Sequence, residues 1–143
     1  MNELYLMIAI APRDSARQFL TLFATHSVAV TLSTLAQGTA GNQLLDYFGL
    51  EKTEKVVTFS FVTRSTWRSV KSAMQRELRI DVPGTGIAFI IPVSSIGGKK
   101  PLAFFTDGQD FEAGEESTLK NTKYELLVVI ANQGHTELIM DAA

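Results

Sequence analysis

The 143-residue chain contains no cysteine, and this absence excludes several kinds of chemistry. A chain without cysteine has no disulfides, no thiolate nucleophile and none of the commonest zinc ligands. It also has only two histidines, His26 and His135, which are far apart in the sequence and have no acid or nucleophile in a motif beside them. We therefore expect no metal site and no catalytic residues, and we expect both histidines to lie at the surface or at helix ends.

Long apolar runs are missing as well. No run approaches the ~20 residues of a membrane helix, and the N-terminus lacks the basic start and the cleavage site of a signal peptide. The excess of basic residues in the first 100 positions is too small for a nucleic-acid reader, which would show clustered basic stripes. We therefore expect a cytoplasmic protein that neither inserts into a membrane nor binds nucleic acid.

The charge that is present is divided unevenly. Residues 1–100 have a net charge of +4, whereas residues 101–143 have a net charge of −6. A mildly basic body suits an anionic small ligand. The acidic stretch 107–116 does not match a calcium loop, because Gly108 stands second and the carboxylates do not alternate. We interpret residues 101–121 as an acidic, solvated linker.

Apolar periodicity predicts the order βαββαβ within residues 1–100. Residues 3–11 are apolar on both faces, which is typical of a strand in the middle of a sheet. Alternating patterns predict further strands over 28–33, 57–61 and 87–93, and Pro92 indicates that the last is an edge strand. One helix is expected to begin at Pro12 and a second to be capped by Thr63 or Ser65. The second helix has an apolar stripe made of Trp67, Val70, Met74 and Leu78.

With right-handed crossovers this order gives a ferredoxin-like α+β fold. We predict a four-stranded antiparallel sheet of spatial order 4-1-3-2 with both helices on one face. The other face of the central strand is apolar too, so we expect the chain to associate with copies of itself through that face.

The opening strand–helix pattern returns near the end of the chain. Residues 6–11 read LMIAIA and residues 126–131 read LLVVIA, and each is followed by a turn and an amphipathic stretch. We therefore predict a strand over 124–131 with a helix after it. Residues 122–143 are interpreted as the start of a second module or as a strand–helix unit added to the first.

Three glycine-bearing loops are candidates for binding an anion. They are Gly38-Thr39-Ala40-Gly41, Gly84-Thr85-Gly86 and Gly97-Gly98-Lys99-Lys100. Glycines let backbone N–H groups approach phosphate oxygens, and lysines add positive charge. None of the three is a Walker loop or a dinucleotide fingerprint, so the residues alone favour turns as the explanation of these glycines.

The chain resembles the PII signal-transduction (nitrogen regulatory protein P-II) superfamily in three features. These are the order of its elements, the Pro-Gly-Thr-Gly-Ile-Ala-Phe sequence that leads into strand 87–93, and Gly97-Gly98 after that strand. It is most similar to the PII-like branch, some members of which carry two modules in tandem. The resemblance implies a homotrimer that is not an enzyme and requires no cofactor. It implies binding of ATP, ADP or AMP, often with 2-oxoglutarate, between subunits, and regulation of an enzyme or membrane transporter, in nitrogen metabolism, through the loop over 38–54.

The same resemblance implies which residues bind the ligand. They are Gly38 and Thr39 where the long loop opens, Gly84, Thr85 and Gly86 in the phosphate-contacting loop, and Gly97, Gly98, Lys99 and Lys100 beside a neighbouring subunit's nucleotide. Ile87-Ala88 follows this loop, where the family carries an acidic residue and a lysine around its glycines, so another anion or no ligand also stays open. Tyr47 of the long loop is expected to be a packed residue. The alternative functions are a small-molecule enzyme on a ferredoxin-like oligomer and a ligand-free assembly module.

Overall fold

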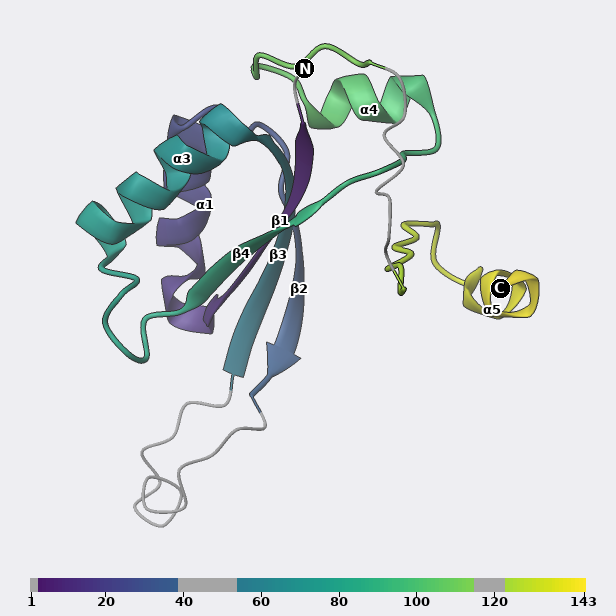
Figure 1. The fold of residues 1–143 in the computed structure, drawn as a ribbon. Coiled ribbons are helices and arrows are strands. Elements are labelled where there is room, and N and C mark those ends of the chain that lie inside the picture. Colours follow the sequence, from purple (N-terminus) through teal and green to yellow (C-terminus); the bar gives the residue numbers. More distant parts are fainter. Residues whose placement is uncertain (1–2, 39–53, 115–122) are drawn as a thin grey trace.

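The computed structural model describes residues 3–38, 54–114 and 123–143 (Figure 1). Its elements in chain order are β1 (Leu4–Pro12), the 3-10 turn η1 (Arg13–Ser15), α1 (Ala16–Thr25), β2 (Leu32–Gln37), β3 (Glu54–Thr63), α3 (Arg64–Ala73), the π-helical turn η2 (Met74–Leu78), β4 (Ile87–Pro92), α4 (Lys99–Phe105) and α5 (Thr136–Ala142). Thr39 and Tyr47 lie outside the described residues.

The four strands form an antiparallel sheet of order β2-β3-β1-β4, which confirms the predicted ferredoxin-like α+β fold. β1 is hydrogen-bonded to β3 on one side and to β4 on the other, as expected for a strand that is apolar on both faces. Pro92 lies on β4 at the sheet edge, where its missing N–H breaks no ladder.

Helices α1 and α3 cover one face of the sheet (Figure 1). The predicted apolar stripe of α3 and η2 packs into this layer, with Val70 and Met74 buried and Trp67 and Leu78 half-buried against the core. Thr63 is the N-cap of α3, because its side chain accepts a hydrogen bond from the backbone N–H of Thr66. The remaining buried residues of this core include Tyr5, Met7, Ala9, Ala11, Phe19, Leu22, Phe23 and Val62.

The opposite face of the sheet is also apolar. The pairs Leu6–Phe61 and Ile8–Phe59 point toward it from β1 and β3. On β4 the same face holds Ile87, which is 55% exposed, and Phe89, which is 39% exposed. Self-association through this face stays a prediction.

The second strand begins later than predicted. β2 starts at Leu32, whereas the alternating pattern predicted a strand from Val28. Val28 is instead buried in the helix layer, and its N–H donates to the Phe23 carbonyl at 3.0 Å. Burial of this side chain holds residues 28–31 in the connection from α1, so only Leu32 and Ser33 of the predicted pattern lie in the sheet.

The linker prediction is wrong for the first part of residues 101–121. Residues Lys99–Phe105 form α4, and the Phe105 ring lies 5.0 Å from the Phe61 ring between centroids. The Gln109 amide Nε2 donates to the Phe61 carbonyl at 2.7 Å, and the Thr63 N–H donates to Gln109 Oε1 at 3.0 Å. This side chain takes the place of a neighbouring strand where β2 does not reach, because the pairing of β2 with β3 ends at Phe59.

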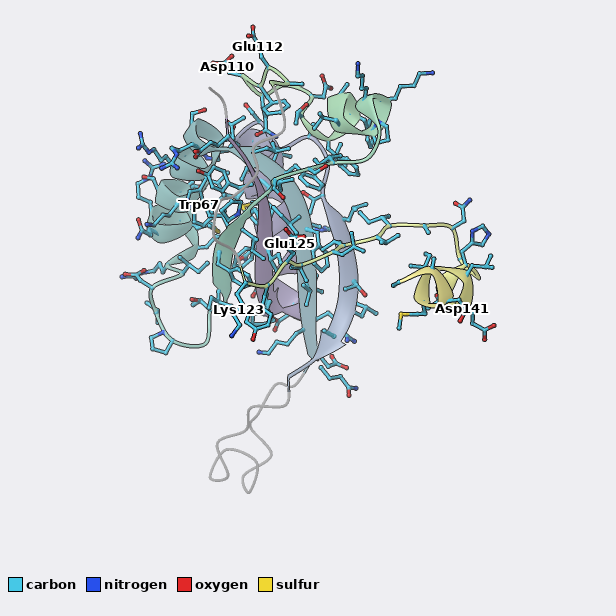
Figure 2. The ribbon with its side chains drawn as sticks, turned by 45° about the vertical axis from the view of Figure 1, so that its right-hand side comes forward. Trp67, Asp110, Glu112, Lys123, Glu125 and Asp141 are labelled. Carbon is cyan, nitrogen blue, oxygen red and sulfur yellow. The ribbon has the colours of Figure 1, made fainter. Side chains whose placement is uncertain are left out.

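Only the helical half of the expected C-terminal extension is formed. Residues 124–131 carry no strand and their large apolar side chains are exposed, whereas α5 begins at Thr136, 120 residues after the start of α1. A strand needs a ladder partner, and among the described residues none is paired with this segment. α5 stands away from the sheet in both views (Figure 1, Figure 2). Within the described ranges, no helix is long and apolar enough to cross a membrane.

Replacing Gln109 by alanine should lower the free energy of unfolding by about 1–3 kcal/mol, because two half-buried backbone groups of β3 lose their partner. Urea denaturation followed by circular dichroism measures this change. Glu112→Ala, an exposed position in the same segment, is the control and should unfold like the parent chain. Equal stability of the two variants would show that the Gln109 amide contributes nothing.

Candidate functional site

The loop from η2 to β4 is closed by its own hydrogen bonds. Arg79 ends η2 in a left-handed conformation with φ of 52°, and the Val82 N–H donates to its carbonyl at 2.9 Å. The Thr85 N–H and the Thr85 hydroxyl both donate to the Val82 carbonyl, at 3.3 and 2.6 Å. Because the Thr85 hydroxyl proton is used within the turn, an anion here would depend on other donors.

Gly86 is required by a close approach of the chain to β1. Its φ is +140°, and a Cβ at this position would lie 2.8 Å from the Ile10 carbonyl oxygen and 3.2 Å from Phe19 Cζ. Gly84 has a φ of +88°, but a Cβ there would meet no described atom within 4 Å. Gly86 therefore has a packing role whether or not it also contacts a ligand.

Gly38 lies at the same end of the sheet as Gly86 but at the opposite edge. Gly38 follows β2, whereas Gly86 precedes β4, and β3 and β1 lie between those strands. Three strand spacings of about 4.8 Å separate the two edges by ~14 Å. Within one chain these two glycine loops do not form a common site.

The third loop lies at the other end of the sheet. Gly97 and Gly98 follow β4, and Lys99 and Lys100 form the exposed first turn of α4 rather than part of a loop. Gly98 has a φ of +95° at the start of this helix. The structure thus places the predicted ligand-binding residues at both ends of the sheet, so a site that uses all of them needs more than one chain.

A small cavity lies beside Gly86, between β4 and the helix formed by α3 and η2. Its volume is about 200 Å³, and the residues that line it are Trp67, Lys71, Met74, Gln75, Ile80, Asp81, Gly86, Ile87 and Ala88. Ligand pockets usually measure roughly 300–1,000 Å³. This cavity is therefore too small for a whole nucleotide and suits an apolar group of side-chain size.

Sequence reasoning did not single out Arg13, which lies at the same end of the sheet as Gly38. Its Nη1 is 3.4 Å from Glu54 Oε1, and its Nε is buried without a hydrogen-bond partner among the described residues. Glu54 begins β3, directly after the loop over 38–54. The Pro12-Arg13-Asp14 sequence gave only a helix-start signal, because the contact with Glu54 bridges 41 positions of the chain.

A charged cluster lies at the other end of the sheet. Arg64 Nη2 donates to Glu3 Oε2 at 2.7 Å, and its guanidinium lies 5.5 Å from the centre of the Tyr5 ring. The Tyr5 hydroxyl donates to the same carboxylate. This hydrogen bond to Glu3 raises the pKa of Tyr5, while the bonds from Tyr5 and Arg64 lower the pKa of Glu3. Arg64 is exposed, and its contacts with Glu3 and Tyr5 link the first residue of α3 to the start of β1.

At the level of sequence, no protein-family model and no curated protein matches the chain. Its structure is similar to a protein of Thermus thermophilus described as a PII-like signalling protein, with a TM-score of 0.51, 16% identity, and coverage of 68% of this chain and 94% of that one. It is also similar to CPII, a nitrogen regulatory PII-like protein from Thiomonas intermedia bound to ADP, AMP and bicarbonate. That match has a TM-score of 0.51, 10% identity, and coverage of 64% and 90%.

The chain has the PII-like fold. A Bacillus cereus protein related to NIF3 shares it, with a TM-score of 0.51 and 18% identity, but there the match covers 66% of this chain and only 26% of the other. The PII-like fold therefore also occurs as part of a larger chain. Identities this low establish the fold, and function has to be argued from the site.

Gly86→Ala should destabilise the chain by at least about 2 kcal/mol, since the new Cβ meets backbone. Gly84→Ala should cost about 1 kcal/mol, from its positive φ alone. Thermal unfolding of the two variants side by side gives the comparison. If Gly86→Ala were the milder change, the close approach to Ile10 would be refuted.

Glu3→Gln should lower the pKa of Tyr5 toward its ordinary value, because the amide is a weaker acceptor than the carboxylate. The raised pKa means that the Tyr5–Glu3 bond stabilises the fold at neutral pH and that this contribution is lost as pH rises through the folded pKa of Tyr5. Absorbance titration of tyrosinate, in a background with Tyr47 and Tyr124 replaced by Phe, measures it. An identical titration curve with and without the carboxylate would contradict the assignment.

Proposed function

We propose that this chain is a PII-like regulatory protein of the cytoplasm, which binds a small anion, an adenine nucleotide, between the subunits of a homotrimer. The observation that carries the proposal is the placement of the glycine loops and lysines at opposite ends of one PII-like sheet. In a single chain these groups are too far apart to share a ligand, whereas the ends of β2 and β4 from two copies can face each other.

Each part has a distinct role in this proposal. Backbone N–H groups around Gly84 and Gly86 would bind phosphate oxygens at close range, because glycine carries no side chain of its own. Lys99 and Lys100, which are exposed on α4, would add charge from a neighbouring copy. Gly38 would bring the opening of the long loop to the same ligand.

The loop over 38–54 would be the regulatory element. Its two ends are held by β2, which ends at Gln37, and by β3, which begins at Glu54. The contact between Arg13 and Glu54 lies where this loop ends and β3 begins. An anion bound near Gly38 would compete with Glu54 for the Arg13 guanidinium, and this would link occupancy to the position of the loop. The loop would then contact a regulated enzyme or membrane transporter in nitrogen metabolism.

The nucleotides and bicarbonate bound to CPII support an anionic ligand on this fold. The proposal includes no enzymatic activity and no required cofactor. Across the described parts of the chain, no group of three or more carboxylate or imidazole side chains is placed to hold a metal ion. We further propose that residues 1–100 form one module and that residues 122–143 repeat its opening unit.

Calorimetric titration with ATP, ADP and AMP, each with and without 2-oxoglutarate, tests the proposal. We expect saturable binding of at least one nucleotide, and a Lys99→Gln/Lys100→Gln variant should bind it about tenfold more weakly through the loss of two charge-assisted contacts. Lys123→Gln, which removes an exposed lysine far from α4 in the sequence, should bind like the parent chain.

Sedimentation equilibrium of the same samples should give the mass of a trimer. Absence of heat with every nucleotide would leave the ligand-free assembly module as the better account. Turnover of a bound nucleotide into products would favour an enzyme.

A further inference from the structure

The segment over 124–131 has the sequence of an apolar strand, but it pairs with no strand in the part of the chain that the structure describes. Leu127 is 78% exposed and Val129 is 50% exposed, and their neighbours Leu126, Val128 and Ile130 are exposed as well. The segment repeats residues 6–11 at an offset of 120, and the helix after it starts at the corresponding position. In its first occurrence this sequence pairs with β3 and, as far as Ile10, with β4, and most of its side chains are buried. An exposed copy of it is therefore suited to pair with the edge of a sheet.

β4 offers such an edge. The Val93 N–H donates to the Leu4 carbonyl, and in an antiparallel ladder the bonded positions alternate. The backbone groups of Ala88 and Ile90 therefore point away from β1, and so does the carbonyl of Pro92. Pro92 has no N–H to leave unpaired, so the free edge presents two N–H groups and three carbonyls.

The 200 Å³ cavity described above lies at the beginning of this edge, where Gly86, Ile87 and Ala88 line it together with residues of the helix layer. Ala88 forms part of its wall, and Trp67, Met74 and Ile80 are among its apolar lining residues. Figure 2 shows Trp67 on the helix layer beside the sheet. Recognition of an added strand normally combines backbone pairing with pockets for alternate side chains, and the β4 edge supplies both.

We propose that residues 124–131 of one copy add to the free edge of β4 in a second copy, antiparallel to it. The direction follows from the repeat, because the equivalent residues of β1 pair with β4 in the antiparallel sense. Met7 and Ala9 face the helices in β1, so Leu127 and Val129 face them in the added strand. One of these two side chains then occupies the cavity beside Trp67, which has room for a group of side-chain size.

The occupant is a second copy because every chain carries both the donor segment and the acceptor edge. In the structure of one chain the donor side chains are exposed, so the segment leaves its own β4 edge open. Donor and acceptor are different surfaces, which makes this a head-to-tail contact. It is independent of nucleotide binding.

Amide hydrogen exchange at Ala88 and Ile90, measured by NMR on the full chain, tests the proposal. These N–H groups should exchange at least about tenfold more slowly than N–H groups at an unpaired sheet edge. Dilution should reduce this protection, because it separates the copies. A Leu127→Asp/Val129→Asp variant should lose the protection. A Leu138→Asp/Met140→Asp variant, with the same change at two exposed positions of α5, should keep it. The Met7 amide reports that each variant is folded.

A mixing experiment separates the second copy from the chain's own tail. Unlabelled parent chain is added to the ¹⁵N-labelled Leu127→Asp/Val129→Asp variant, whose β4 edge is intact. Restored protection of Ala88 and Ile90 supports addition from another copy. Three results would overturn the proposal: unprotected amides in the parent chain, protection that survives the double substitution, and protection that mixing does not restore.

Discussion

The double pairing of β1 is the constraint on which the rest of the structure depends. This strand is hydrogen-bonded to β3 and β4 and is apolar on both faces, so one layer of helices satisfies only half of its surface. The helix face is closed by α1 and α3. On the other face, Phe105 covers the end near Leu6 and Phe61, while Ile87 and Phe89 stay exposed. The two faces of the sheet therefore differ, because the helices close one face whereas the other is covered at one end only.

Much of this architecture could be predicted from local patterns. The two-sided apolarity of residues 3–11 predicted a central strand, Pro92 predicted an edge, and helical spacing predicted the buried stripe of α3 and η2. The errors occur where a distant contact decides the outcome. Val28 alternates like a strand residue but is buried in the helix layer. Gln109 stands in an acidic stretch that resembles a linker, yet its amide is hydrogen-bonded to β3. Local sequence carries no signal for such contacts.

The candidate site was predictable as a set of loops but not as a geometry. Glycine and lysine identify backbone that an anion can approach, whereas only the strand order shows that Gly38 and Gly86 lie at opposite edges. The role of Gly86 in packing against Ile10 was also invisible in the sequence, because φ and a neighbouring carbonyl define it. The role of Arg13 could not be predicted from the sequence, because its contact with Glu54 depends on the register of β1 and β3.

The Gln109 amide also makes this fold sensitive to a slow chemical change. Its oxygen accepts from the Thr63 N–H while its nitrogen donates to the Phe61 carbonyl, so both ends of the amide are in use. Hydrolytic deamidation to glutamate would keep the acceptor but replace the donor by a second negative oxygen. The Phe61 carbonyl would then face a charge that repels it, at a half-buried position. Ageing of a single side chain would thus weaken the attachment of residue 109 to the end of the sheet without breaking the polypeptide.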